Sequence, residues 1–245
     1  MSVKKFDAVL QSARMITPRV RELAFARADG APLEFEPGQF VSLMIDTPEK
    51  LLRRSYSIAT VPESGDEQLR IAVAHVEGGR ATKLLFDMQK GDALPAIGPA
   101  GRFVLRDDGH CRYVLLATGT GVTPYRAFLP ELRRRLKDPK ISVDIVLGVR
   151  KPDELLYGDD FRAMDEEFDN FRFFSCYSRS MPGVCGPLDR SGYVQEILDE
   201  LKLDPSHDVV YLCGNPGMID AAASYCEEAG FPIGNVRREK YVSSN

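Results

Sequence analysis

Apolar residues in the first part of the chain alternate with other residues over several short segments. The segments 20–25, 40–45 and 69–76 each follow a period of two, which is typical of strands. Turns rich in glycine and proline separate them, at 29–30, 37–38, 78–79 and 98–101. One helix is expected over 82–89, where Leu84, Leu85 and Met88 share a face. This pattern predicts a small antiparallel β-barrel over residues 1–107.

The pattern changes beyond a polar loop at 106–110. Residues 113–117 are continuously apolar, as expected of a strand that is covered on both faces. Further strands are predicted at 142–147, 172–177, 209–212 and 236–241, and helices at 124–136, 159–167, 194–201 and 218–228. This alternation predicts an α/β domain with a parallel sheet over residues 108–245.

Composition and charge narrow the classes of function. Among 245 residues, 44% are hydrophobic and 28% are charged, as in an ordinary globular protein. No apolar run approaches the roughly 18 residues of a membrane span, and the polar start does not resemble a signal peptide. The net charge of -4 argues against nucleic-acid binding. Residues 1–107 carry 15 basic and 14 acidic side chains, so an acidic partner would favour this half.

Cysteine and histidine usage argues against a metal site. The five cysteines are scattered, which favours reduced thiols in a cytoplasmic protein. Their spacing does not match that of an iron–sulfur cluster. None of the three histidines lies near a pair of cysteines, so no zinc site is expected.

A glycine loop follows the first strand of the predicted α/β domain. Gly119, Thr120 and Gly121 precede a helix that is expected to begin at Pro124. Glycines here let backbone N–H groups approach a pyrophosphate at the positive end of a helix. Proline replaces the third glycine of the full dinucleotide fingerprint, and it suits the first turn of a helix. A tight strand-to-helix turn without a ligand remains an equal alternative for this loop.

Three arginines follow the next predicted strands and bear on the choice of coenzyme. Arg150 ends the second strand, Ser178 and Arg179 end the third, and Arg190 follows a short loop. An acidic residue after the second strand would suit the 2′-hydroxyl of NAD, whereas guanidinium groups suit a 2′-phosphate. The sequence therefore favours NADPH over NADH, with solvated surface arginines as the alternative.

Three segments together resemble a known family. Arg54, Ser55, Tyr56 and Ser57 lie on a predicted strand, residues 119–124 form the glycine loop, and residues 213–218 read Cys-Gly-Asn-Pro-Gly-Met. In this order and at about these distances they resemble the R-x-Y-S, G-T-G-x-x-P and C-G-x-P-x-M motifs of the ferredoxin–NADP reductase family. The resemblance covers nearly the whole chain, and the bacterial ferredoxin/flavodoxin–NADP reductases are the most similar members.

The resemblance implies a flavin site in the barrel. Arg54 would pair with the FAD pyrophosphate, Tyr56 would stack on the flavin, and Ser57 would hydrogen-bond near its N5 atom. The start of the expected helix near Gly79 would hold the same pyrophosphate, and an anion at a helix N-terminus is favourable in any protein. A solvated Arg54 and an ordinary half-buried Tyr56 are the alternatives. The residues assigned to FAD are Arg54, Ser55, Tyr56, Ser57, Ala72, Ala74, Gly79, Ala81 and Thr82.

The resemblance also implies a coenzyme site and a catalytic set. The residues assigned to NADP(H) are Gly119, Thr120, Gly121, Pro124, Arg150, Ser178, Arg179, Arg190, Cys213, Gly214 and Met218. Ser57, Cys213, Glu239 and Tyr241 would be catalytic, and Tyr241 would have to leave the flavin before nicotinamide could reach it. Residues 242–245 continue beyond Tyr241, unlike the end of plant-type members. A small buried Cys213 and a Tyr241 that merely ends a strand are the alternatives.

The implied activity is transfer of electrons from NADPH through FAD to a one-electron carrier, ferredoxin or flavodoxin. The carrier is expected to be a separate protein, because the chain has no iron–sulfur motif. Ferredoxins and flavodoxins are usually acidic, which fits the basic residues Arg53, Arg80, Lys83 and Arg102. An NAD(P)H flavin reductase, the reductase component of an oxygenase and a non-catalytic nucleotide-binding subunit remain alternatives. FAD that stays bound should make the purified protein yellow.

Overall fold

The computed structural model describes residues 3–47, 50–62, 68–107 and 109–241. The chain divides into two compact units. The first contains the residues up to Leu105 together with Thr123–Pro130, and the second contains Arg106–Val122 and the residues from Glu131 onward. In the described ranges, no helix is both long enough and apolar enough to cross a membrane.

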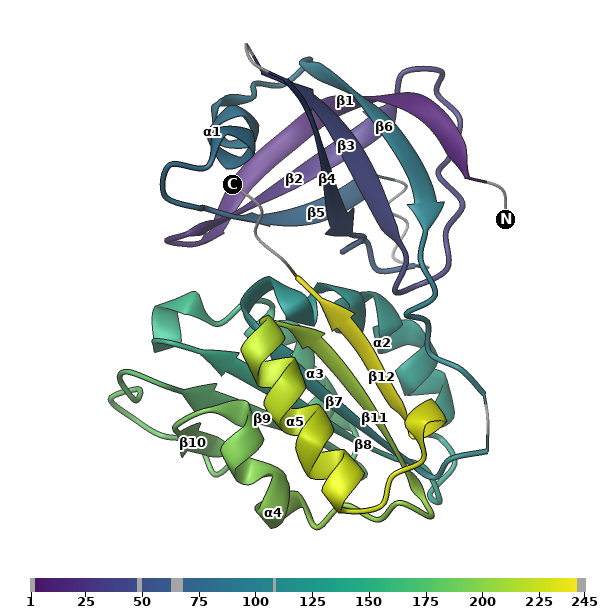
Figure 1. The fold of residues 1–245 in the computed structure, drawn as a ribbon, viewed down its shortest axis with the longest axis vertical. Helices are drawn as coiled ribbons and strands as arrows, with labels where there is room; N and C mark the ends of the chain where they lie inside the picture. Colours follow the sequence, from purple (N-terminus) through teal and green to yellow (C-terminus); the bar gives the residue numbers. More distant parts are fainter. Residues whose placement is uncertain (1–2, 48–49, 63–67, 108, 242–245) are drawn as a thin grey trace. The chain divides into compact units, whose positions relative to one another are not determined.

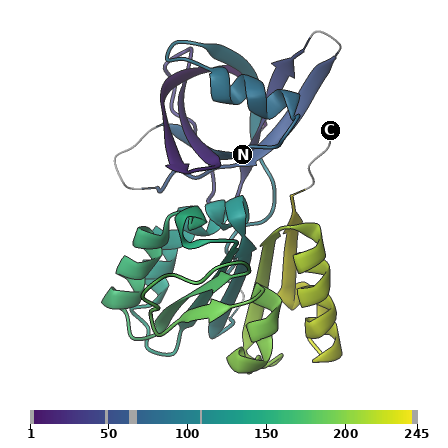
Figure 2. The same ribbon diagram turned by 90° about the vertical axis from the view of Figure 1, so that its left-hand side faces the viewer.

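Six antiparallel strands form the sheet of the first unit. They are β1 (Lys4–Thr17), β2 (Val20–Arg27), β3 (Phe40–Asp46), β4 (Leu51–Ser57), β5 (Leu69–Ala74) and β6 (Ala93–Ala100), in the order β4-β3-β6-β1-β2-β5. The two outer strands meet just beyond β4, because Ile58 bridges to Ile71 and the amide of Ala59 donates to the carbonyl of Arg70 at 2.7 Å. The sheet thus curls into the predicted barrel, as Figure 2 shows.

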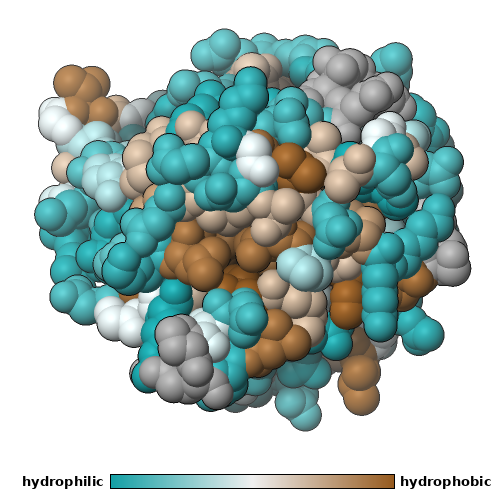
Figure 3. Space-filling view, turned by 90° about the horizontal axis from the view of Figure 1, so that it is seen from above, coloured by the Kyte–Doolittle hydropathy of each residue, from teal (hydrophilic) through white to brown (hydrophobic). Residues whose placement is uncertain are grey.

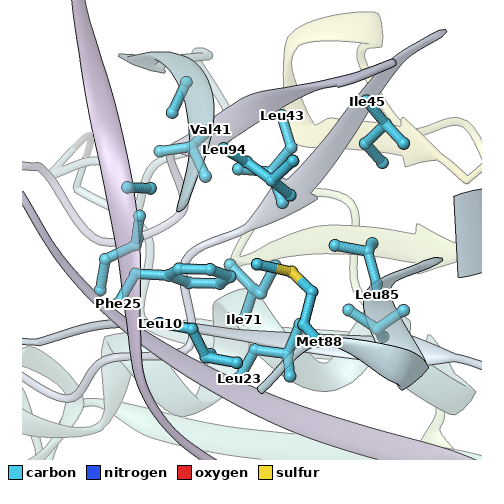
Figure 4. Close-up of a cluster of buried hydrophobic side chains, with 14 of the residues drawn as sticks. Leu10, Leu23, Phe25, Val41, Leu43, Ile45, Ile71, Leu85, Met88 and Leu94 are labelled. Atoms are coloured by element: carbon cyan, nitrogen blue, oxygen red, sulfur yellow. The ribbon is translucent and has the colours of Figure 1, made fainter. Parts of the chain in front are cut away.

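The barrel encloses an apolar core. Alternate residues of the strands point inward, among them Leu23, Phe25 and Leu43, all fully buried (Figure 4). Leu85 of α1 (Arg80–Asp87) and Met88 belong to the same cluster, so this helix is held by its apolar face.

Apolar side chains also lie on the surface. Figure 3 shows the molecule from above, and in that view they gather near the middle of the face, surrounded by hydrophilic side chains.

The second unit is a parallel sheet covered by helices on both faces (Figure 1). Its strands are β7 (Arg112–Thr118), β8 (Ser142–Val149), β9 (Phe171–Tyr177), β10 (Asp189–Ser191), β11 (Asp208–Gly214) and β12 (Val236–Lys240), in the order β10-β9-β8-β7-β11-β12. Its helices are α3 (Gly158–Glu167), α4 (Leu198–Leu201) and α5 (Pro216–Glu228), and α2 (Thr123–Arg135) belongs to it only from Glu131 onward. Helices α4 and α5 pack on one face of the sheet, and α3 packs on the other. The predicted fold class is therefore confirmed.

A buried ion network joins the amino ends of four neighbouring strands. Asp144 in β8 accepts from Arg112 in β7 and from Arg172 in β9, each at 2.6 Å. Arg112 also lies 3.4 Å from Asp208 in β11. Both aspartates are almost fully buried, and breaking such a pair typically costs about 3–5 kcal/mol. The network fixes the sheet at the edge opposite to the carboxyl ends of its strands.

Three strands were not predicted from the sequence. β1 contains a register shift between Leu10 and Ser12, which interrupts its alternation. β6 contains Pro95 and Pro99, residues that argue against a strand, and β10 is only three residues long. The segment 194–201 begins as the 3-10 helix η3 (Val194–Ile197) and becomes α-helical only at α4.

Candidate functional site

The glycine loop lies against the end of β11. Residues Gly119–Val122 form the 3-10 helix η1 between β7 and α2. A Cβ atom on Gly121 would lie 2.3 Å from the carbonyl oxygen of Cys213, and one on Gly214 would lie 2.5 Å from the hydroxyl of Thr118. Gly214 also has a φ of +125°, which other residues rarely adopt. The two backbones can therefore approach this closely only because both positions are glycine.

The opposite side of the same loop is open. Gly119 has a φ of +52°, and a Cβ atom there would meet no atom within 4 Å. Thr123 begins α2, and its buried hydroxyl has no hydrogen-bond partner in the described part of the chain. An unpaired buried hydroxyl costs about 1–3 kcal/mol, so its presence calls for an explanation. An open glycine, a helix N-terminus and an orphaned hydroxyl together fit the phosphates of a bound nucleotide.

Part of the 213–218 motif has a local structural cause. The side chain of Asn215 caps α5 by accepting from the amides of Gly217, at 2.8 Å, and Met218, at 3.3 Å. Pro216 is the first residue of the helix, and Met218 is buried in the core. Asn215 and Pro216 thus start the helix, while the role assigned to Met218 in coenzyme binding stays a prediction.

Three of the four predicted catalytic residues lie together at the carboxyl end of β11. Cys213 pairs with Glu239 in the parallel ladder, and the amide of Tyr241 donates to the carbonyl of Gly214 at 2.8 Å. Burial raises the pKa of the Cys213 thiol well above its ordinary value, the charge of Glu239 raises it further, and a hydrogen bond with Tyr241 lowers it. Cys213 is therefore a neutral thiol at physiological pH. The tail at 242–245 lies outside the described residues.

Two of the three predicted arginines lie side by side. The amide of Arg179 donates to the carbonyl of Arg150 at 3.0 Å, and the amide of Ser178 donates to that of Val149 at the same distance. Arg150, Ser178 and Arg179 thus meet at the carboxyl ends of β8 and β9. The Arg179 side chain is exposed and has no ion-pair partner in the described ranges.

Carboxylates hold the other two guanidinium groups. Arg150 donates to both oxygens of Glu154, at 2.8 and 2.6 Å, and this pair raises the pKa of Arg150. Arg190 lies in β10 level with Cys176 rather than with Arg179, and it donates to both oxygens of Glu200, at 2.8 and 2.5 Å. The structure therefore does not bring Arg190 to the other two arginines.

The predicted flavin strand is β4, in the first unit. Tyr56 is half-buried opposite Val41, and burial raises its pKa to about 12 against the opposing effect of Arg54. Ser57 is buried, whereas the hydroxyl of Ser55 is hydrogen-bonded to that of Ser42 at 2.9 Å. Arg54, Tyr56 and Ser57 therefore remain the candidates for flavin contacts.

Helix α1 begins as an anion site would require. Gly79 precedes it with no side-chain cap, so the first amides of the helix have no side-chain partner from that residue. The hydroxyl of Thr82 donates to the carbonyl of Gly79 at 3.0 Å and fixes the turn, and Ala81 is buried beside it. These residues fit the pyrophosphate of a flavin nucleotide. Ala72 and Ala74 pair with β2, and their role in the flavin site stays a prediction.

Sequence reasoning missed Thr123 and Glu154. The spacing of Glu154 from Arg150, four residues along the chain, could have shown that an acid was within reach. The orphaned hydroxyl of Thr123 has no comparable signal, because burial and lack of a partner are visible only in the folded chain.

Two family models match this chain. The oxidoreductase FAD-binding domain matches residues 7–105, and the oxidoreductase NAD-binding domain matches residues 115–224. Ferredoxin–NADP reductase B of Sorangium cellulosum is 34% identical over 98% of this chain and 99% of its own length. The electron transfer component of toluate 1,2-dioxygenase from Pseudomonas putida is 26% identical over 98% of this chain and 68% of its own length.

Solved structures show the same architecture over the whole chain. An Amycolatopsis cytochrome P450 reductase superposes with a TM-score of 0.85 at 28% identity, over 99% of this chain and 71% of that one. A ferredoxin–NADP+ reductase from Neisseria gonorrhoeae, with bound FAD and NADP, superposes with a TM-score of 0.82 at 24% identity, over 97% and 98% of the two chains. The chain therefore belongs to the ferredoxin–NADP reductase family and is an oxidoreductase with an FAD-binding and an NAD(P)-binding domain.

Proposed function

We propose that this protein passes electrons from NADPH, through FAD, to a separate one-electron carrier, ferredoxin or flavodoxin. The observation that carries the proposal is the grouping of Cys213, Glu239 and Tyr241 beside the glycine loop. A neutral thiol, a carboxylate and an aromatic ring at the carboxyl edge of a parallel sheet suit the nicotinamide end of a coenzyme. Its pyrophosphate would lie on the loop at Gly119.

The residues of the chain would bind and orient the reactants. Bound FAD would supply the chemistry that links two-electron transfer from the coenzyme to one-electron release. Arg54 and the first turn of α1 would hold its pyrophosphate, and Tyr56 would pack against its ring. Cys213 is a small, neutral and buried side chain, and Glu239 beside it would accept a hydrogen bond from the nicotinamide amide.

The choice of carrier draws support from the relatives. Ferredoxin–NADP reductase B is matched over 99% of its length, whereas the propane 2-monooxygenase reductase component of Rhodococcus jostii is matched over 61% of its length. The second candidate is the reductase component of an oxygenase, which the toluate dioxygenase and P450 reductase relatives favour.

Two further expectations stay predictions. They are the domain boundary between residues 107 and 108 and the cytoplasmic location.

A spectral titration of the purified protein tests the proposal. We expect a yellow protein whose flavin absorbance bleaches on addition of NADPH and recovers on addition of oxidised ferredoxin or flavodoxin. A colourless protein that reduces only added free flavin would contradict the proposal. Recovery only with an oxygenase component would favour the second candidate.

Cys213→Ala tests the catalytic grouping. Single-turnover reduction of bound flavin by NADPH should slow, while the flavin content stays unchanged. Cys226→Ala is the matched control, because Cys226 is equally buried in the second unit but lies in α5. Equal rates of flavin reduction in the two variants would contradict a role for Cys213 in the site.

A further inference from the structure

The charge around the predicted 2′-phosphate site differs from what three free arginines would give. Arg150 ends β8 at the edge where Arg179 follows β9, and their backbones are hydrogen-bonded. Yet Nε and Nη2 of Arg150 donate to the two carboxylate oxygens of Glu154, in the 3-10 helix η2 (Pro152–Glu154). The Glu154 side chain is 17% exposed and that of Arg150 is 39% exposed, so the pair is partly shielded from water.

This geometry makes Glu154 unfavourable for NADPH in two ways. The carboxylate occupies Nε and Nη2 of Arg150, two of the donors that could form a bidentate pair with a 2′-phosphate. The carboxylate also places a negative charge close to any phosphate bound between Arg150 and Arg179. Neither effect acts on NADH, which has a hydroxyl at this position, and an acidic residue after the second strand suits that hydroxyl.

We propose that Glu154 determines coenzyme choice by withdrawing Arg150 from the 2′-phosphate, which leaves Arg179 as its main contact. The inference rests on the proposed function and deepens it. It means that the protein uses NADH as well as NADPH, and that its preference is set by one acidic side chain rather than by the number of arginines.

Substitution of Glu154 tests the inference by binding as well as by activity. Binding of AMP and of 2′-phospho-AMP to the flavin-loaded protein is measured by calorimetry, which reports on the site without any reaction. We expect Glu154→Gln to increase the preference for 2′-phospho-AMP over AMP about tenfold, because one charge-assisted contact is gained. The ratio of kcat/KM for NADPH to that for NADH should rise by a similar factor.

Two further variants isolate the cause. Glu200→Gln is the matched control, because Glu200 holds Arg190 in the same bidentate manner but away from Arg150, and it should leave both ratios unchanged. Arg150→Gln combined with Glu154→Gln should lose most of the gain. Ratios that do not change in Glu154→Gln, or a gain that persists undiminished in the double variant, would overturn the inference.

The failure of the proposed function would look different. A protein that oxidises neither coenzyme would contradict electron transfer, whereas the binding of the two nucleotides would still measure what Glu154 does. Oxidation of NADPH alone by the unmodified protein, with no measurable use of NADH, would overturn the inference and leave the proposed function intact.

Discussion

Gly121 offers the sharpest test of how the coenzyme loop is built. In Gly121→Ala the new Cβ would lie 2.3 Å from the carbonyl oxygen of Cys213, 2.6 Å from its carbon and 2.8 Å from the Cα of Gly214. All three atoms belong to the backbone, so no side-chain rotation can relieve the overlap. Either η1 or the end of β11 must move.

The expected cost follows from these distances. Overpacking of a tight interior typically costs about 1–3 kcal/mol, and a backbone overlap belongs at or above the upper end. At roughly 2–4 °C for each kcal/mol in a chain of this size, Gly121→Ala should lower the Tm of the protein by about 6–12 °C. Coenzyme binding should weaken as well, because the loop leaves its position.

Gly119→Ala is the control from the same loop. Its Cβ would meet no atom within 4 Å, so the cost is only the strain of a positive φ, roughly 1–2 kcal/mol. Thermal unfolding of both variants, with and without NADPH, measures the two effects separately. We expect Gly121→Ala to lose stability and binding, and Gly119→Ala to lose mainly binding. A Gly121→Ala protein as stable as Gly119→Ala would refute the packing argument.

Three further predictions concern buried polar groups. Thr123→Val should raise the unfolding free energy of the nucleotide-free protein by about 1 kcal/mol, because it removes an unpaired buried hydroxyl; destabilisation would show that the hydroxyl has a partner. Burial raises the pKa of Tyr211 from 10 to about 12. The free energy of unfolding that the neutral phenol contributes is therefore fully present below pH 10 and is lost as the pH rises toward 12. Tyr211→Phe should flatten that loss in urea unfolding at alkaline pH, and an unchanged slope would contradict this. Of the five cysteines, only the exposed Cys111 and Cys185 should react quickly with a thiol reagent, because Cys176, Cys213 and Cys226 are buried with raised pKa values; a third fast thiol would contradict the burial.

The α/β half of the fold was easier to predict than the barrel. A parallel strand such as β7 is covered on both faces and appears as an uninterrupted apolar run, which polar neighbours delimit on each side. The barrel strands depend on long-range pairing instead. β6 has two prolines yet forms a ladder with β1 and β3, because those neighbours are supplied by distant parts of the chain.

In the site, too, features that depend on the local sequence could be predicted, whereas features that depend on long-range packing could not. The motif residues of the glycine loop could be found from their order, and register in the sheet then places Cys213 beside Glu239. The orphaned hydroxyl of Thr123 could not be found in this way. Its burial is a property of the packed chain, and no spacing in the sequence encodes it.

Coenzyme choice illustrates why the type of a residue is weaker evidence than its partner. Arg150, Arg179 and Arg190 are chemically equal in the sequence, and counting them favours a phosphate. In the folded chain Glu154 pairs with Arg150 and Glu200 pairs with Arg190. Of these three arginines, only Arg179 is exposed without an ion pair in the described part of the chain. The charge that a ligand meets is the sum over each arginine and its acid, so the acidic residues carry as much of the specificity as the basic ones. Substituting Glu154 should therefore raise the preference for NADPH over NADH, whereas substituting Arg179 should lower it.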